Sequence, residues 1–357
     1  MKIRTLIICI LCALLLIGCG KGDAAQAPGP VATSNTAGQN AVPEATLQAE
    51  QKIVIVAATA SATLAPETKA PTPEPTPVPT PEPTATPVPK LGVLDGKFAD
   101  KFVTGEPVLT ENSYQTETLA IFISRVVDES KTITNHTFVY YMADVYFQNM
   151  EDFRSAAAKS WKQRWDNDWL VDIAKKNDAI FAVSGDFTLS RKIGLAVRNG
   201  ELLQEEHDTK RDVGVIYRDG HMETYTAKNV PVQQLISDPE VWQILGFGPE
   251  LLDGDGQVKT SFNDPNKVGR ANIRNAVGYF EPGHYCFVYV QPYKVRKDDT
   301  CLDMESFSKL MHGLGCVRAY NLDGGGTADM YFNGKLVSDK GLGQTRKNHD
   351  IYYIPKA

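Results

Sequence analysis

A long segment with no capacity to form a core confines any globular structure in this chain to the region after it. Residues 20–90 are rich in Ala, Thr, Pro and Gln and nearly free of aromatic side chains. Such a segment cannot bury enough apolar surface to offset the entropy lost on ordering. Between Pro71 and Pro89, proline alternates with Thr, Glu and Val, which is typical of a stiff polyproline II spacer. The sequence therefore predicts a disordered Pro/Thr-rich linker over residues 20–90 and a globular domain over residues 91–357.

The first 19 residues have the features of an export signal that ends at a lipidated cysteine. Lys2 and Arg4 precede an apolar run that is too short for a membrane span and has the length of a signal-peptide core. The run ends in Leu16-Ile17-Gly18-Cys19, which resembles the bacterial lipoprotein cleavage box. Acyl chains on Cys19 would anchor the protein firmly. We expect a protein on the cell membrane that faces outside the cytoplasm; an ordinary signal peptide is the alternative.

The net charge limits the class of partner that this chain is expected to bind. The net charge is −6 and no basic stripe is present, so nucleic acid is not an expected partner.

Three of the six cysteines, Cys286, Cys301 and Cys316, lie in the predicted domain. They allow one disulfide, for example Cys301–Cys316, or three buried thiols. None of them has zinc-ligand spacing. The sequence predicts no cofactor and leaves a divalent metal requirement open.

Strand patterns outnumber helix patterns in residues 91–357. The pattern predicts an α+β fold, with a mixed, mostly antiparallel sheet core and a few flanking helices. Runs rich in β-branched and aromatic residues predict strands; these are Leu119–Val127, Thr137–Phe147, Ala179–Ser184, Gly194–Val197, Val213–Tyr217, Met222–Thr226, Ala276–Tyr279, Tyr285–Gln291, Cys316–Leu322 and Asp329–Phe332. Helical spacing of apolar residues predicts three helices; these are Glu151–Arg164, Asp168–Lys176 and Asp303–Leu314, the last with a weak capping signal at Thr300.

The stretch from Asn321 to Thr327 is the most informative for chemistry. A predicted strand delivers Asp323 to three consecutive glycines, Gly324, Gly325 and Gly326. Such a run suits a backbone that approaches a ligand closely, and its free amides could bind phosphate or sugar. Thr327 adds a hydroxyl. A flexible hairpin is the alternative interpretation on chemistry alone.

The same stretch, NLDGGGT, resembles the signature of the phosphodiester glycosidase family. Other motifs agree in order: Arg274-Asn275-Ala276-Val277-Gly278 is similar to a family strand, Phe247–Leu252 to its Gly-Pro-x-Leu segment, and Asn333-Gly334-Lys335 to its closing hairpin. The resemblance covers residues 115–357. It implies a hydrolase that cleaves a sugar from a phosphodiester, with a glycan or phosphoglycan as substrate.

The resemblance also implies a set of site residues. Asp323 would act as nucleophile, base or oxocarbenium stabiliser, and Arg274 would clamp phosphate with its planar donor fork. Where the family has Asn-Gly-Gly-Phe-Phe, this chain has Ser184-Gly185-Asp186-Phe187-Thr188, so Gly185 keeps its place and Asp186 becomes a possible second carboxylate. Asn321 and Arg346 complete the predicted binding set. A non-catalytic envelope lipoprotein that binds phosphoglycan is the alternative function.

Overall fold

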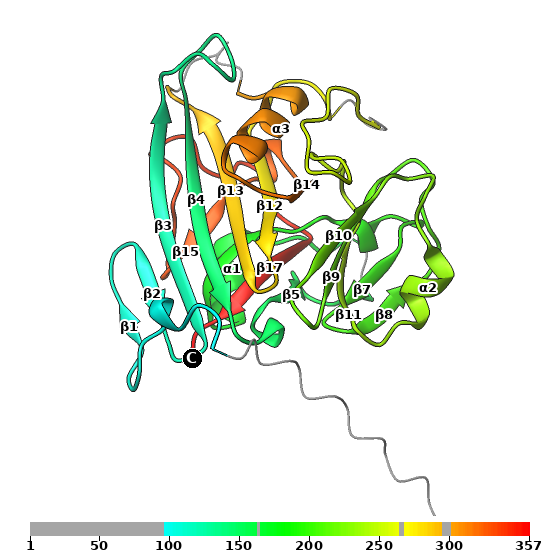
Figure 1. The fold of residues 1–357 in the computed structure, drawn as a ribbon, viewed down its shortest axis with the longest axis horizontal. Helices are drawn as coiled ribbons and strands as arrows, with labels where there is room; N and C mark the ends of the chain where they lie inside the picture. The colour runs from blue at the N-terminus through cyan, green and yellow to red at the C-terminus, as the bar shows by residue number, and fades with distance from the viewer. Residues whose placement is uncertain (1–95, 163–164, 264–267, 295–300) are drawn as a thin grey trace, which may run out of the picture. The chain divides into compact units, whose positions relative to one another are not determined.

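The computed structural model describes residues 96–162, 165–263, 268–294 and 301–357 (Figure 1). The predicted signal peptide, Cys19 and the linker lie outside these residues. Within the described part of the chain, no helix is both long enough and apolar enough to cross a membrane.

The largest element of the fold is an antiparallel seven-stranded sheet with the order β1-β2-β3-β4-β13-β12-β14. Its strands are β1 (Val108–Leu109), β2 (Ser113–Gln115), β3 (Leu119–Asp128), β4 (Phe138–Phe147), β13 (His284–Pro292), β12 (Arg274–Glu281) and β14 (Arg318–Asn321). Strands β3 and β4 pair along their full length, from Leu119↔Phe147 to Asp128↔Phe138. The β-branched and aromatic residues on which these strand predictions rest occupy the paired positions.

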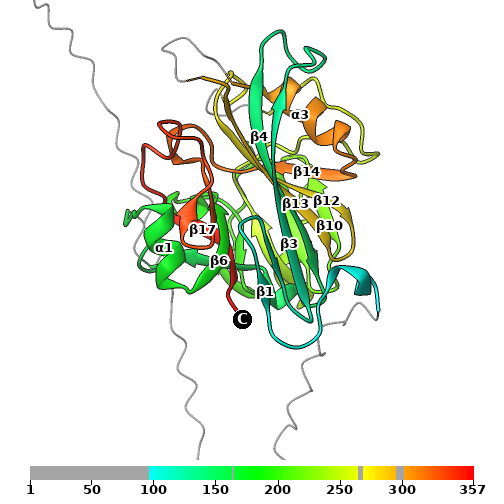
Figure 2. The ribbon, with the colours of Figure 1, turned by 90° about the vertical axis from the view of Figure 1, so that its left-hand side faces the viewer.

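A five-stranded sheet packs against one face of the first sheet, as Figure 2 shows. Its order is β16-β15-β6-β17-β5. Its strands are β16 (Lys335–Leu336), β15 (Met330–Phe332), β6 (Ala179–Ser184), β17 (Asp350–Pro355) and β5 (Arg154–Ala157). Phe181 of β6 and Phe287 of β13 meet between the sheets, with ring centroids 5.2 Å apart. The main hydrophobic core therefore lies between these two sheets.

Two smaller sheets form the part of the domain at the right of Figure 1. The three-stranded sheet has the order β10-β9-β11, and β7 pairs with β8. These elements are β7 (Ala196–Arg198), β8 (Glu201–Gln204), β9 (Val213–Tyr217), β10 (Met222–Tyr225) and β11 (Val241–Leu245), with helix α2 (Val232–Ser237). Leu235 of α2 packs into their own small core.

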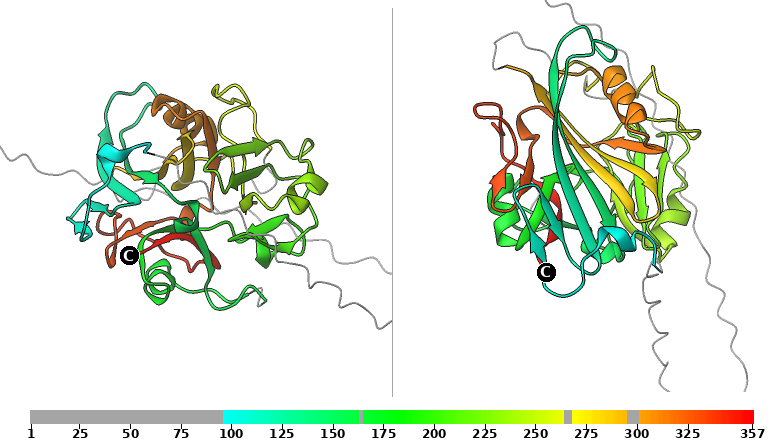
Figure 3. Two further views of the ribbon diagram at one scale, coloured as in Figure 1. Left: turned by 60° about the horizontal axis from the view of Figure 1, so that its bottom comes forward. Right: turned by 60° about the vertical axis from the view of Figure 1, so that its left-hand side comes forward.

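Helices cover the outer faces of the two large sheets (Figure 3). Helix α3 (Met304–Gly313) packs on β12, β13 and β14, and α1 (Leu170–Lys176) packs on the five-stranded sheet. The N-cap of α3 is Asp303, whose side chain accepts a hydrogen bond from the backbone N of Ser306 at 2.8 Å. The cap is thus not Thr300, which lies outside the described residues.

The predicted α+β class is confirmed, since every described strand pair is antiparallel and helices are few. The helix predicted over Glu151–Arg164 is wrong. Residues Met150–Asp152 form one 3-10 turn, and Arg154–Ala157 form β5, which pairs with β17. Pairing across the sheet outweighs the helical preference of Ala156 and Ala157, because propensity is only a weak prior.

The three cysteines of the described chain are buried free thiols. Of the two alternatives left open by the sequence, three buried thiols is therefore the one found, and the Cys301–Cys316 disulfide is not formed. Cys316 Sγ lies 3.6 Å from Cys286 Sγ, beside Gly278 of β12. A Cβ atom at position 278 would lie 2.5 Å from one sulfur and 2.7 Å from the other. The glycine therefore makes room for the two thiols in the core beneath α3.

Candidate active site

The two large sheets meet at Gly185, directly after β6. The backbone N of Gly185 donates to the carbonyl of Asp350 at 3.0 Å, and its carbonyl accepts from the backbone N of Asp323 at 3.1 Å. A Cβ at position 185 would lie 2.3 Å from Asp350 Oδ1. Only glycine allows this contact, which brings the ends of β6, β14 and β17 together.

Beside this junction lies a cavity of about 810 Å³. This volume is within the range of about 300–1,000 Å³ that is usual for ligand sites. Its wall is formed by Trp165, Asn167, Trp169, Phe187, Ser190, Phe247, Val268, Asn272, Arg274, Asp323, Gly324, Thr327, Thr345, Arg346, Lys347 and His349. Five residues predicted from the sequence line this cavity; they are Asp323, Arg274, Gly324, Thr327 and Arg346.

Asp323 is the acidic side chain of this wall. Burial raises the pKa of Asp323 to about 6, although a hydrogen bond from Thr327, the charge of Arg346 and the backbone amide of Gly324 oppose the shift. A carboxyl with a pKa near 6 exchanges its proton in the neutral range. Such a group can act in proton transfer or as a nucleophile at physiological pH.

The glycine run forms a tight 3-10 turn, Gly325–Thr327. The backbone N of Gly325, at φ +64°, donates to the carbonyl of Ile273 at 2.8 Å. The carbonyl of Gly326 accepts from the backbone N of Thr345 at 2.8 Å and of Arg346 at 2.7 Å. A Cβ at position 326 would lie 2.5 Å from Thr345 Oγ1. The glycines thus let the 345–346 segment lie directly on the turn, and the amide of Gly325 is used within the protein.

Arg274 contributes to the wall while it holds a neighbouring loop. The side chain is 3% exposed. Its Nε donates to the carbonyl of Leu302 at 3.0 Å, and its Nη2 donates to the carbonyls of Val268, at 2.7 Å, and Arg270. These bonds fix the loop on one side of the cavity, so part of the guanidinium already serves the structure.

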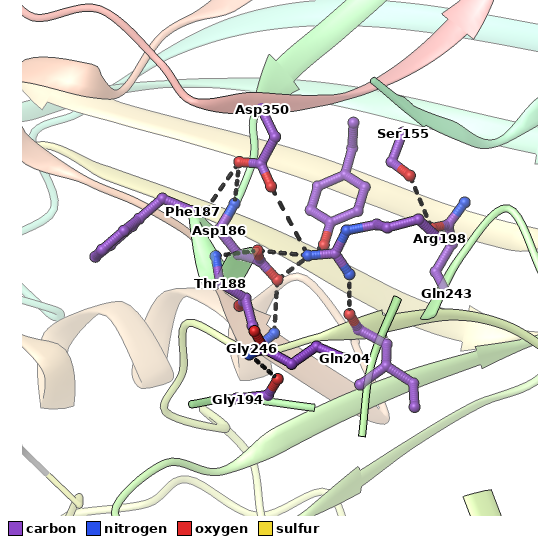
Figure 4. Close-up of polar contacts among 12 residues, drawn as sticks. Ser155, Asp186, Phe187, Thr188, Gly194, Arg198, Gln204, Gln243, Gly246 and Asp350 are labelled. Atoms are coloured by element: carbon purple, nitrogen blue, oxygen red, sulfur yellow. Dashed lines mark hydrogen bonds and ion pairs between the residues drawn. The ribbon is translucent and has the colours of Figure 1, made fainter. Parts of the chain in front are cut away.

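Asp186, the predicted second carboxylate, is buried among polar partners, as Figure 4 shows. It is not one of the residues that line the cavity. Its oxygens accept from Arg198 Nη2 at 2.6 Å, Tyr352 Oη at 3.0 Å, and the backbone N of Thr188 at 2.9 Å and Gly246 at 2.6 Å. Burial raises its pKa, but Arg198 and the backbone donors outweigh burial and lower the pKa to about 2. This geometry corrects the catalytic role expected for Asp186, because its oxygens are occupied by donors.

Asp350 shares the same arginine. Its Oδ1 accepts from the backbone N of Asp186 at 3.0 Å and of Phe187 at 2.9 Å, and its Oδ2 lies 3.8 Å from Arg198 Nη2. Burial and the charge of Asp186 raise the pKa of Asp350 to about 7. Because Phe187 lines the cavity, this buried cluster positions one side of the wall.

Asn321, Gly185, Gly325 and Gly326 support the wall without forming it. The fully buried Asn321 side chain donates from Nδ2 to the carbonyl of Gly248 at 2.8 Å. Arg346, by contrast, is exposed in the wall, and its guanidinium makes no hydrogen bond or ion pair with any residue of the described ranges.

Several wall residues were not predicted from the sequence, and His349 is the most unusual of them chemically. Its side chain is 4% exposed, and Nδ1 donates to the carbonyl of Asp166 at 3.0 Å. Nε2 has no hydrogen-bond partner among the described residues, and burial lowers the pKa of the imidazole. Lys347, Trp165 and Trp169 were also missed. The basic and aromatic character of segments 161–169 and 346–349 is the signal that could have found them.

Comparison with known proteins finds one family and one curated relative that this chain resembles. A family model described as phosphodiester glycosidase matches residues 177–354. The SPbeta prophage-derived uncharacterized protein YomE of Bacillus subtilis (strain 168) is 25% identical over 177 residues, which span 48% of this chain and only 27% of that relative.

One solved structure shares the fold, and a second is similar to a lower degree. The zebrafish N-acetylglucosamine-1-phosphodiester alpha-N-acetylglucosaminidase catalytic domain, auto-inhibited by its pro-peptide, matches with a TM-score of 0.53 and 17% identity. The match covers 71% of this chain and 89% of that chain. A hypothetical protein from Synechocystis matches with a TM-score of 0.48 and 13% identity, over 67% of this chain and 62% of the other.

Proposed function

We propose that this chain is an extracytoplasmic hydrolase acting on a glycan, because the phosphodiester glycosidase family model matches residues 177–354. The bond cleaved joins a sugar to a phosphodiester in an envelope or extracellular polymer. The observation that supports this most directly is Asp323, a partly buried carboxyl with a pKa of about 6 in the wall of a cavity.

The chemistry of the reaction fits the wall residues. When the anomeric C–O bond breaks, the leaving group departs as a phosphate monoester and the sugar becomes an oxocarbenium-like centre. A carboxylate can stabilise or attack this centre before water completes the hydrolysis. Asp323 lies in the cavity wall and would act in this way; the hydroxyl of Thr327 donates to the carbonyl of Gly324 at 2.8 Å and so holds the turn that follows Asp323. The cationic side chains of Arg346 and Lys347 line the same cavity and suit the departing phosphate. Phosphate is already a stable leaving group, so strong acid assistance is not required.

The N-terminal sequence supports a location outside the cytoplasm. The apolar run before Cys19 and the proline-rich segment that follows would place the domain outside the cytoplasm on a lipid anchor and a spacer. A membrane-held hydrolase of this kind would meet polymers of the envelope or its surroundings.

The experiment measures sugar release from glycosyl 1-phosphodiesters, including one of N-acetylglucosamine, by the purified full chain. Asp323→Asn should lower kcat at least about a hundredfold, because a positioned proton-transfer group usually contributes about a hundredfold or more to the rate. Asp255→Asn, at an exposed carboxylate outside the wall, is the matched control and should retain activity. Equal turnover in both variants would exclude Asp323 as the reactive group.

A binding module without turnover is the second candidate. The enclosed position of Asp186 favours it, because glycosidases ordinarily use two carboxyl groups and the described cavity wall contains one. Binding of a phosphoglycan with no sugar release from any substrate of the panel would select this function.

A further inference from the structure

Two tryptophans at the cavity are unusually open to solvent. Trp165 is 80% exposed and Trp169 is 37% exposed, and both belong to the wall. Large aromatic side chains usually bury most of their surface in a core or an interface. Exposed apolar surface beside a cavity is a common mark of a ligand-binding groove.

The tryptophans lie next to positive charge. Lys347 Nζ is 5.9 Å from the centroid of the Trp169 ring and 3.4 Å from Asp168 Oδ1. Arg346, its neighbour in the chain, is exposed in the same wall. Aromatic faces and cations thus occur together, and we name Trp165, Trp169, Arg346 and Lys347 the aromatic–cationic rim.

The backbone connects this rim to the reactive carboxyl. Asp168 and Asn348 form an antiparallel bridge, with N···O distances of 2.9 and 2.7 Å. The segment that contains Arg346 is in turn bonded to the carbonyl of Gly326, in the turn that follows Asp323. The rim is therefore held in a defined position relative to Asp323 by two sets of backbone hydrogen bonds.

We propose that the aromatic–cationic rim is a subsite for a further sugar unit of a polymeric substrate with repeating sugar and phosphate groups. This inference rests on the proposed function and specifies its substrate class. Indole faces match the C–H faces of pyranose rings, and the cations match the phosphate of the next repeat. The cavity of about 810 Å³ is near the upper end of the range for sites that hold drug-sized ligands, which exceed one sugar in size.

The test compares two substrates with the purified full chain. One is the methyl phosphodiester of N-acetylglucosamine, with a single sugar, and the other is an oligomer of N-acetylglucosamine 1-phosphate units. The wild-type protein should prefer the oligomer in kcat/KM. Trp165→Ala combined with Trp169→Ala should lower this preference about tenfold, mainly through KM, as expected for loss of ring stacking.

Tyr293→Ala provides a matched control. Tyr293 is 41% exposed and has Lys294 Nζ 5.3 Å from its ring centroid, but it lies outside the cavity wall. Its removal should leave the preference unchanged. An equal loss in the control and in the tryptophan variant, or no change in the tryptophan variant, overturns the proposal.

Calorimetric titration of the same oligomer separates this proposal from the proposed function. Oligomer binding that weakens about tenfold in the tryptophan variant supports the rim even if no sugar is released, and then only the hydrolase assignment fails. Equal oligomer affinity in wild type and variant refutes the rim, whatever the activity.

Discussion

The buried carboxyl of Asp350 should make the stability of this domain fall as pH rises through neutrality. Its pKa is raised to about 7 by burial and by the charge of Asp186, whereas an unfolded Asp titrates near ~3.9. The folded state therefore binds this proton more tightly than the unfolded chain. The resulting stabilisation is complete below the unfolded pKa and is lost as pH rises through about 7.

The size of the effect follows from linkage. Between pH 6 and pH 8, a carboxyl with these two pKa values loses on the order of 1 kcal/mol of stabilisation. Asp323 and Asp329, whose pKa values burial raises to about 6, each add a smaller loss in the same direction. Asp350→Asn retains an oxygen that can accept from the backbone N of Asp186 and Phe187 but removes the titration.

The assay is urea unfolding at pH 6 and at pH 8. The free energy of unfolding of Asp350→Asn should decline by about 1 kcal/mol less than that of the wild type over this interval. The readout is this difference, so any constant effect of the substitution cancels. Asp255→Asn, at an exposed carboxylate, should leave the wild-type decline unchanged. An identical decline in Asp350→Asn and the wild type would refute the assignment of a buried, proton-binding carboxyl.

Three further expectations follow from the same region. Gly185→Ala would place a Cβ 2.3 Å from Asp350 Oδ1 and 2.8 Å from its backbone C, so it should destabilise the domain by about 3 kcal/mol or more in urea unfolding; Gly254→Ala, with nothing within 4 Å, should not. Asp186→Asn removes the main partner of the buried Arg198 and should cost about 3–5 kcal/mol at pH 7, and a loss below 1 kcal/mol in thermal or urea unfolding would contradict a structural ion pair. If Asp323 acts as a carboxylate, kcat/KM should fall as pH drops below about 6, and a flat profile from pH 5 to pH 7 would exclude that role.

The sequence predicted some strands of the sheets correctly and missed others. The bounds of β6 match the predicted Ala179–Ser184, because a short apolar run between polar residues has one simple interpretation. Strand β17 was missed, although Ile351–Ile354 is apolar, because the notable feature of this segment was the polar run before it. The segment around Ala156 was assigned to a helix, since periodicity within one segment does not reveal the strand it pairs with.

The candidate site shows a similar division. The glycine motif located Asp323 and Thr327 in the cavity wall, because glycines mark close backbone approach. The backbone bridge between Asp168 and Asn348 brings two tryptophans and His349 to the same cavity wall, although the two bridged residues are far apart in the sequence. No local sequence pattern predicts a contact between residues so far apart, so only the three-dimensional structure shows that these residues line the cavity.

The contrast between Asp186 and Asp323 explains why residue type and strand position were not enough to assign roles. Both are aspartates just beyond the end of a strand, and they lie on either side of the Gly185 junction. Asp186 receives an arginine, a tyrosine hydroxyl and two backbone amides, which outweigh burial and keep it ionised. Asp323 has weaker opposing contacts, so burial raises its pKa. The number of donors, which only the three-dimensional arrangement sets, separates a carboxylate committed to the scaffold from one available for chemistry.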